Sequence, residues 1–172
     1  MLTDKNILFV GAGTMGKAIA NGLISSNKVK TITALEKNQK LADKANKHSP
    51  ETLSVVPITH AQDHVKLADI ILLCVKPQDI TTSIELIKPY LKPDAVIISI
   101  AAGVSSTTIE NALQTHNPVI RVMPNTPCLI QEGMLVICRG SHAQQDHANI
   151  ALDLFSCLGE CLEVEEKHMN AV

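Results

Sequence analysis

Short hydrophobic runs alternate along the chain with segments in which hydrophobic residues recur every three or four positions. The first run, residues 7–10, reads Ile-Leu-Phe-Val, and the segment after it carries Met15, Ile19 and Leu23 at helical spacing. A short continuous run is typical of a buried strand, and the wider spacing is typical of a helix with one buried face. The first part of the chain therefore predicts a strand, a tight turn and a helix over residues 15–24.

The alternation of strand and helix patterns continues to the end of the chain. The other expected strands are residues 31–35, 53–56, 70–75, 95–100, 119–122 and 134–138, with a last edge strand at 162–164. The other expected helices are residues 39–47, a stretch ending at Ala68, a segment marked by Ile80, Ile84, Ile87 and Leu91, and residues 143–158. One more helix is expected where Thr107 and Glu110 have the T-x-x-E spacing of a capping box. This order predicts an α/β fold with a doubly wound, mostly parallel sheet and helices on both faces.

The composition fits such a sheet. Of the 172 residues, 45% are hydrophobic and only 2% are aromatic, so the core must consist of Ile, Val, Leu and Ala side chains. Aliphatic strands of this kind are typical of sheets that helices cover on both faces. Because no linker rich in Gly, Pro or Ser interrupts the chain, we expect a single domain.

Charge and hydropathy exclude two classes of partner. The 15 Lys and Arg residues nearly balance the 17 Asp and Glu residues, and the chain has neither a basic block nor aromatic side chains on which bases could stack. The longest hydrophobic run, residues 70–75, is too short to span a bilayer, and residues 1–6 lack the hydrophobic region of a signal peptide. We therefore expect a cytoplasmic protein that binds neither nucleic acid nor a membrane.

The cysteines predict neither disulfides nor a metal site. There are five of them, an odd number, and no pair has C-x-x-C spacing. Disulfide frameworks and zinc sites need paired or regularly spaced cysteines. We expect reduced thiols and no bound metal.

The sequence between the first strand and its helix carries the most specific motif. Gly11, Gly13 and Gly16 form a G-x-G-x-x-G that directly follows a strand and opens a helix. In dinucleotide-binding folds of the Rossmann type the first glycine permits the tight turn, the second lets the backbone approach a pyrophosphate, and the third lets the helix pack on the strand. The helix N-terminus then presents N–H groups to the phosphates. The motif predicts a Rossmann-like fold that binds NAD or NADP.

The end of the second strand bears on which dinucleotide is bound. Glu36 lies 20 residues after Gly16, where a carboxylate accepts hydrogen bonds from the adenosine ribose and repels a 2′-phosphate, as in NAD-binding proteins. Lys37 follows it and could pair with that phosphate, as in NADP-binding proteins. Both cofactors therefore stay open, as does a plain exposed Glu-Lys pair.

Three further strand ends carry residues suited to a ligand, because ligands of doubly wound sheets bind outside the carboxyl ends of the strands. Lys76 follows the strand at 70–75, and small residues follow the strand at 95–100. The third loop, residues 121–127, contains two prolines whose fixed φ angles could hold the amide of Asn125 in place. A solvated lysine and a proline-stiffened surface turn are the simpler interpretations.

Taken together, these motifs resemble those of pyrroline-5-carboxylate reductases, which reduce a cyclic imino acid to proline with NAD(P)H. The matching segments read GAGTMG (11–16), AIANGLI (18–24), VKP (75–77), SIAAGV (99–104), MPNTP (123–127) and EGM (132–134). The resemblance implies that the pyrophosphate contacts Val10, Gly11, Ala12, Gly13, Thr14, Met15 and Gly16. It implies that Glu36 and Lys37 face the adenosine ribose. It places the nicotinamide beside Cys74, Val75, Lys76, Pro77, Ile100, Ala101 and Ala102, with Asn125 as a candidate wall on the substrate side.

Members of that family continue beyond a segment like residues 169–172 into a helical domain that dimerises and supplies most of the imino acid site. The resemblance therefore implies that residues 1–165 form the cofactor-binding domain and that residues 166–172 begin the connection to the helical domain. It also implies that this chain is inactive alone and that a homo-oligomer forms only with the helical domain. Two alternatives stay open. One is a β-hydroxyacid dehydrogenase of the 3-hydroxyisobutyrate type, against which residues 99–104 and 123–127 argue, and the other is a non-catalytic dinucleotide-binding module that regulates a partner.

Overall fold

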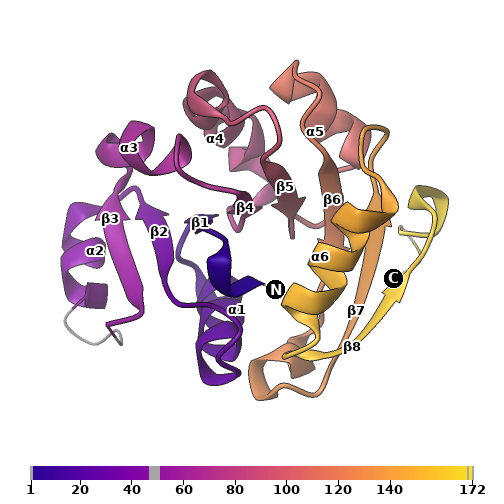
Figure 1. Ribbon diagram of the computed structural model, residues 1–172, viewed down its shortest axis with the longest axis horizontal. Coiled ribbons are helices and arrows are strands. Elements are labelled where there is room, and N and C mark those ends of the chain that lie inside the picture. Colours follow the sequence, from indigo (N-terminus) through magenta and orange to yellow (C-terminus); the bar gives the residue numbers. More distant parts are fainter. Residues whose placement is uncertain (1, 47–50, 170, 172) are drawn as a thin grey trace.

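A single eight-stranded sheet forms the centre of the computed structural model, which describes residues 2–46, 51–169 and 171 (Figure 1). The strand order is β3-β2-β1-β4-β5-β6-β7-β8. The strands are β1 Ile7–Val10, β2 Ile32–Glu36, β3 Leu53–Pro57, β4 Ile70–Leu73, β5 Val96–Ser99, β6 Val119–Met123, β7 Gly133–Arg139 and β8 Gly159–Glu163. All neighbouring strands pair in parallel except β6 and β7, which confirms the predicted mostly parallel sheet.

Helices cover both faces of the sheet, as predicted. The α-helices are α1 Thr14–Ser25, α2 Gln39–Asn46, α3 Ala61–Val65, α4 Ile80–Ile87, α5 Ser106–Leu113 and α6 Gln145–Phe155. Short 3-10 helices are η1 Leu2–Asp4, η2 Ile58–His60, η3 Pro77–Asp79, η4 Lys88–Tyr90, η5 Thr126–Ile130 and η6 Glu166–His168. Helices α1, α2 and α6 share one core cluster, and α3, α4 and α5 share the other. Within the described part of the chain, no helix is long and apolar enough to cross a membrane.

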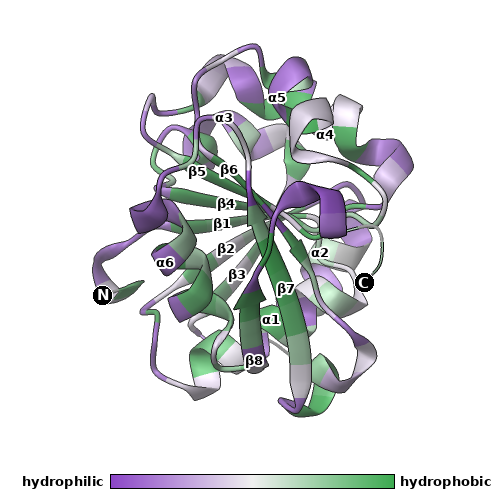
Figure 2. Ribbon diagram, turned by 90° about the vertical axis from the view of Figure 1, so that its right-hand side faces the viewer, coloured by the Kyte–Doolittle hydropathy of each residue, from purple (hydrophilic) through white to green (hydrophobic). Residues whose placement is uncertain are grey.

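The central strands are buried on both faces because they lie between these two helical layers. All four residues of β1 are buried, and so are all four of β4 and of β5. Since successive side chains of a strand point to opposite faces, Ile7 and Phe9 join one core cluster while Leu8 and Val10 join the other. Figure 2 shows the strands as a largely hydrophobic layer between helices that carry both hydrophobic and hydrophilic residues. An uninterrupted aliphatic run is therefore the correct sequence pattern for these strands.

Several predicted boundaries differ from the structure. The strand predicted at 70–75 ends at Leu73, the helix predicted to reach residue 158 ends at Phe155, and residue 47 of the helix predicted at 39–47 lies outside the described residues. The last edge strand exists, but it is β8, which begins three residues earlier than predicted and pairs with β7.

The capping box predicted at Thr107 and Glu110 is wrong. Helix α5 is capped instead by Ser105, whose hydroxyl accepts a hydrogen bond from the Thr108 amide at 3.1 Å. Glu110 turns away from its own helix, and its carboxylate accepts hydrogen bonds from the amide and the hydroxyl of Ser141 at 2.6 and 3.0 Å. The carboxylate of Glu110, which the local spacing predicts as part of the cap, thus bonds to a distant residue instead.

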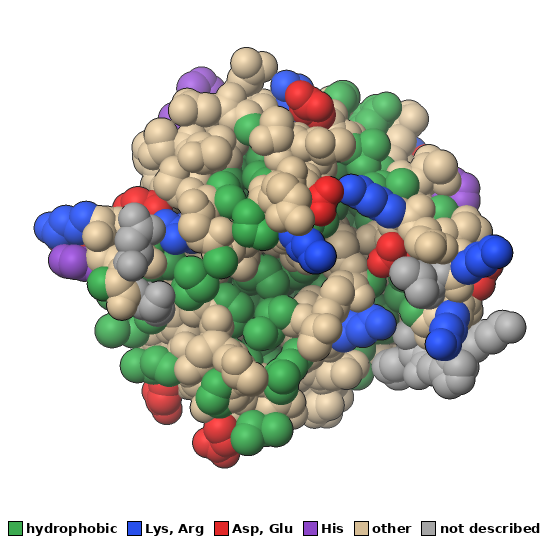
Figure 3. All heavy atoms as spheres, turned by 180° about the vertical axis from the view of Figure 1, so that it is seen from behind, with side chains coloured by type: hydrophobic (Ala, Val, Ile, Leu, Met, Phe, Trp, Pro, Cys, Tyr) green, Lys and Arg blue, Asp and Glu red, His purple; other side chains and the backbone are tan. Residues whose placement is uncertain are grey.

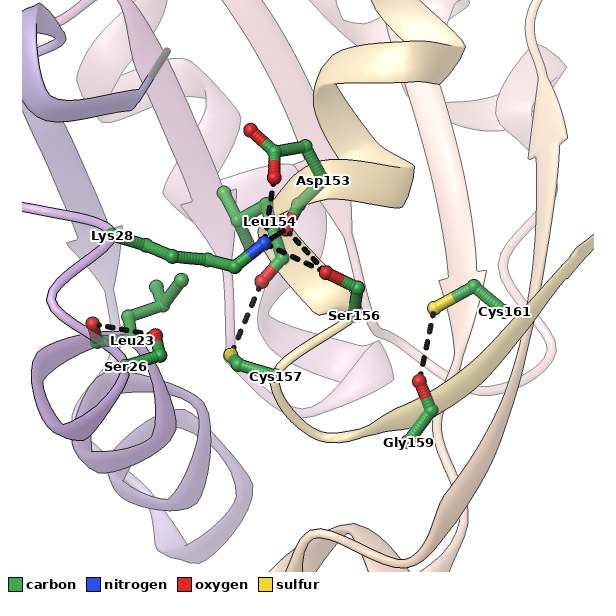
Figure 4. A network of polar contacts seen from close by, with 9 residues as sticks. All are labelled: Leu23, Ser26, Lys28, Asp153, Leu154, Ser156, Cys157, Gly159 and Cys161. Atoms are coloured by element: carbon green, nitrogen blue, oxygen red, sulfur yellow. Dashed lines mark hydrogen bonds and ion pairs between the residues drawn. The ribbon is translucent and has the colours of Figure 1, made fainter.

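A charged contact joins the ends of α1 and α6 (Figure 4). Lys28, after α1, lies 2.6 Å from a carboxylate oxygen of Asp153 and donates to the hydroxyl of Ser156 at 2.7 Å. Figure 4 also shows Cys157 in the turn after α6 and Cys161 on β8, and their thiols donate to the backbone carbonyls of Leu154 and Gly159. The contact fixes α1 and α6 to each other at their carboxyl ends.

The segment after β8 is held to the sheet by a buried charge. The guanidinium of Arg121, on β6, is 2% exposed and lies 2.6 Å from a carboxylate oxygen of Glu166. The second carboxylate oxygen of Glu166 accepts from the thiol of Cys138 at 3.1 Å and from the amide of Ser106 at 3.3 Å. Burial alone would raise the pKa of Glu166, but these hydrogen bonds and the one from Arg121 outweigh it and hold the pKa below its usual value. Glu166 therefore links α5, β6 and β7.

The lowered pKa of Glu166 predicts a loss of stability in acid. Its contribution is fully present above about pH 4.5, the usual range of a glutamate, and is lost as the pH falls through the lowered pKa of the folded state. We expect Glu166→Gln to lower the free energy of unfolding by about 3 kcal/mol at neutral pH, since it leaves Arg121 buried opposite a neutral amide. Urea unfolding between pH 3 and pH 7 measures both effects.

The control for this prediction is Glu165→Gln. Glu165 pairs with Lys167 at 2.6 Å, but both side chains are largely exposed, so this substitution should leave the stability and its pH dependence almost unchanged. Equal effects of the two substitutions would contradict the role assigned to Glu166.

Candidate functional site

A groove of about 350 Å³ lies at the carboxyl ends of β1, β2 and β4. It forms there because β1 is the point at which the strand order changes direction, with β2 on one side and β4 on the other. The residues that line it are Val10, Gly11, Ala12, Gly13, Leu35, Glu36, Lys37, Ile58, Cys74, Val75, Lys76, Gln78 and Asp79.

The floor of the groove depends on a close contact between the glycine turn and the end of β4. Gly11 has a φ of +100°, and a Cβ there would lie 3.0 Å from the carbonyl oxygen of Cys74. A Cβ on Gly16 would lie 3.2 Å from the Cβ of Cys74 and 3.2 Å from the carbonyl oxygen of Gly11. The structure thus gives these two glycines the turn and the close helix packing that the motif predicts.

Gly13 has a different environment. It is the N-cap of α1, with φ −70° and ψ −177°, a conformation open to any residue. A Cβ built on it would meet only the carbonyl oxygen of Cys74, at 4.0 Å. Since no side chain caps α1, the N–H groups of its first turn face this open space, and they make it favourable for a negatively charged group.

Three charged side chains lie at the β2 end of the groove. A carboxylate oxygen of Glu36 accepts a hydrogen bond from the amide of Asn38 at 3.1 Å. The ammonium of Lys37 lies 3.0 Å from a carboxylate oxygen of Asp79, in η3. The end of β2 therefore carries both the carboxylate typical of NAD-binding proteins and the lysine typical of NADP-binding proteins, and the lysine is paired with Asp79.

The β4 end of the groove contains a neutral thiol and a lysine. The amide of Cys74 donates to the carbonyl oxygen of Val10 at 2.9 Å, and burial raises the pKa of the thiol to about 12. Cys74 is therefore a thiol at neutral pH and a weak nucleophile. Lys76, also in the wall of the groove, is exposed.

The predicted residues after β5 lie beside the groove and do not line it. The amide of Ile100 donates to the carbonyl oxygen of Leu73 at 3.2 Å, which fixes this loop against the end of β4. The amide of Ala101 donates to the hydroxyl of Ser99, which is completely buried. Ala101 itself is buried and Ala102 is exposed. The loop thus presents small side chains next to the groove.

The loop after β6 is rigid, and Asn125 contributes to its rigidity. The side-chain oxygen of Asn125 accepts a hydrogen bond from the amide of Met134 at 3.0 Å and lies 3.5 Å from the thiol of Cys128. Asn125 does not line the groove. The structure therefore gives this side-chain oxygen a partner within the protein.

Most of the predicted binding residues meet in one place, but four residues of the groove were missed. Leu35, Ile58, Gln78 and Asp79 line it and were not predicted. Ile58 follows β3 directly, so the rule that ligands bind at the carboxyl ends of strands could have found it. Nothing in the local sequence indicates that Asp79 turns toward Lys37.

Among the described residues outside the groove, neither the cysteines nor the metal-binding side chains form a second reactive centre. All five cysteines are free, and burial raises the pKa of each thiol, to about 12 for Cys138 and to about 11 for Cys161. Within residues 2–46, 51–169 and 171, no three His, Cys, Asp or Glu side chains form a group that could hold a metal ion.

Similarity to known proteins extends over almost the whole chain. It is 34% identical over 173 residues to pyrroline-5-carboxylate reductase 3 of Mus musculus and 35% identical over 172 residues to pyrroline-5-carboxylate reductase 2 of Bacillus subtilis. These alignments cover 99% and 98% of this chain but only 61% and 60% of those proteins. The chain therefore spans about 60% of the length of these relatives.

A solved structure and a family model match the same region. The crystal structure of Plasmodium falciparum pyrroline carboxylate reductase with NADP bound superposes with a TM-score of 0.84 at 27% identity, over 98% of this chain and 61% of that one. Residues 6–103, which include the glycine turn and the whole groove, match the family described as NADP oxidoreductase, coenzyme F420-dependent. The chain belongs to this family.

Proposed function

We propose that the groove binds NADH or NADPH with the pyrophosphate over Gly13. The observation that carries this proposal is the open space at Gly13, which a Cβ would enter without touching the protein closely, directly in front of the first turn of α1. Close contacts explain the glycines at positions 11 and 16, but none explains Gly13. A phosphate that needs the backbone at short range does explain it.

We propose the following roles for the predicted residues. The pyrophosphate is held by Val10, Gly11, Ala12, Gly13, Thr14 and Met15, and Gly16 packs the first turn of α1 against Cys74. Glu36 and Lys37 face the adenosine ribose, because both lie at the β2 end of the groove. The nicotinamide lies toward Cys74, Val75, Lys76 and Pro77, with Ile100, Ala101 and Ala102 beside it.

We propose that the whole protein is a pyrroline-5-carboxylate reductase and that this chain is its cofactor-binding part. The resemblance of its motifs to that family and the relatives of that name support the proposal. The bound nicotinamide would supply a hydride to the imine carbon of the substrate. The residues of this chain orient the cofactor, and their rigid contacts around Gly11 and Gly16 keep its reactive end in place. No side chain described here is assigned as an acid or a base.

The division into parts belongs to the same proposal. Residues 1–165 would form the dinucleotide-binding domain, and residues 166–172 would lead toward the part that binds the imino acid. Homo-oligomers would need that further part. The buried contact of Glu166 with Arg121 would then fix the direction in which the chain leaves the sheet. A cytoplasmic location fits a soluble metabolic reductase.

Binding and turnover should separate in this chain. We expect it to bind NADH or NADPH and to show no measurable reduction of pyrroline-5-carboxylate, since the proposed imino acid site is not within these residues. Calorimetric titration with both dinucleotides and a steady-state assay of nicotinamide oxidation test the two halves. Turnover by residues 1–172 alone would refute the division, and absence of binding would refute the proposed function.

Substitution of Gly13 tests where the pyrophosphate lies. We expect Gly13→Val to weaken dinucleotide binding by at least about a hundredfold, because its side chain occupies the space in front of α1. Its unfolding transition should shift only slightly, by the cost of valine at an N-cap, since a Cβ at this position comes no nearer than 4.0 Å to the packed residues around it.

Gly16→Ala is the matched control for the measurement of stability. Its Cβ falls 3.2 Å from two other atoms of the fold, so this variant should lose about 1 kcal/mol of stability. A Gly13→Val protein that binds with normal affinity would place the phosphates elsewhere.

A further inference from the structure

The ion pair between Lys37 and Asp79 spans the adenosine end of the groove. Lys37 follows β2 and Asp79 ends η3, which follows β4, and their charged groups lie 3.0 Å apart. Both residues line the groove together with Glu36. Their side chains are 55% and 37% exposed, so the pair lies at the rim, where an incoming ligand can reach it. Figure 3, the face opposite to that of Figure 1, shows such a hollow, with hydrophobic side chains inside it and acidic and basic ones at its edge.

Asp79 points toward Lys37 although its position favours another contact. It is the N-cap residue of α4, where an aspartate commonly accepts a hydrogen bond from the first turn of the helix, yet its side chain makes no such bond. The carboxylate is therefore turned away from its helix and into the pair with Lys37. Because α4 does not depend on this side chain, Asp79 can be replaced without removing a helix cap.

The charges at this rim disfavour a phosphate. A phosphate monoester carries about −1.5 to −2 charges at neutral pH. It would meet the carboxylates of Glu36 and Asp79; of the two lysines that line the groove, Lys37 is already paired with Asp79, and Lys76 lies at the β4 end. A 2′-phosphate therefore has to compete with Asp79 for Lys37, whereas the uncharged ribose hydroxyl of NADH makes no such demand.

We propose that Asp79 is a specificity-determining residue, which favours NADH over NADPH by competing with the 2′-phosphate for Lys37. This inference rests on the proposed function, because it assumes that the groove binds the adenosine ribose at this end. Asp79 acts through Lys37 and through its own negative charge. Asp79 contributes little to the binding of the groups that NADH and NADPH have in common.

The test is the ratio of the dissociation constants for NADH and NADPH, measured by calorimetric titration at low and high salt. We expect Asp79→Asn to tighten NADPH binding about three- to tenfold at low salt and to leave NADH binding within about twofold. High salt should reduce the gain, since the charges are exposed. In a Lys37→Ala background the gain should shrink to about twofold, because only the repulsion by Asp79 is then removed.

Asp4→Asn is the matched control. Asp4 forms an exposed pair with Lys30 at 3.5 Å, and Lys30 precedes β2 whereas Lys37 follows it. The two lysines are seven positions apart along an extended strand, roughly 23 Å, which is beyond the screening length at ordinary salt. Asp4→Asn therefore removes the same charge from the same kind of pair at the far end of the strand, and it should leave the ratio unchanged.

The outcomes separate this inference from the proposed function. A gain for NADPH that is specific to Asp79→Asn and reduced by Lys37→Ala supports the inference. If the unsubstituted chain binds both dinucleotides but Asp79→Asn leaves their ratio unchanged, or if Asp4→Asn changes it equally, the inference is wrong and the proposed function stands. If the unsubstituted chain binds neither, both are wrong.

Discussion

The contact between the glycine turn and the end of β4 determines the geometry of the whole groove. The backbone of Gly11 turns with a positive φ and passes so close to Cys74 that a Cβ would lie 3.0 Å from the carbonyl oxygen. Gly16 keeps the first turn of α1 against the same residue. Because these contacts involve backbone and Cβ atoms, the position of α1 cannot be adjusted by a change of rotamer. The helix N-terminus is thus held at a fixed place above the switch in strand order between β2 and β4.

The two ends of the groove differ in how they recognise charge. In front of α1, N–H groups and the helix dipole face an open space, so attraction of a phosphate there depends on the backbone and is little affected by the choice of side chains. At the β2 end, recognition in the proposed function depends on Lys37, which is exposed, and on Glu36 and Asp79, which are half-buried; all three lie outside the core. In the proposed function, affinity for a dinucleotide and preference for one dinucleotide therefore come from different parts of the chain.

The sequence was sufficient for features that depend on local pattern. The aliphatic runs located β1, β4 and β5, and the glycine motif located the turn and α1, because burial and close packing restrict which residues can stand there. Contacts between distant positions could not be predicted. Lys37 and Asp79 are 42 positions apart, Arg121 and Glu166 are 45 apart, and no local rule relates the members of either pair. The capping error at Thr107 has the same origin, since a distant serine takes the carboxylate of Glu110.

Helix α1 also connects the groove to the loop after β6. Its N-terminus faces the groove, and along its length it contacts η5 and α6. The ion pair of Lys28 with Asp153 holds α6 to the turn after α1. The loop itself is stiffened by its prolines and by the hydrogen bond from Met134 to Asn125. A displacement of α1 would therefore also displace the loop after β6, because a close-packed interface between them cannot absorb it. In the proposed function, the loop on the substrate side is therefore positioned by the same helix whose N-terminus faces the phosphates, so the two parts of the site keep a constant spacing.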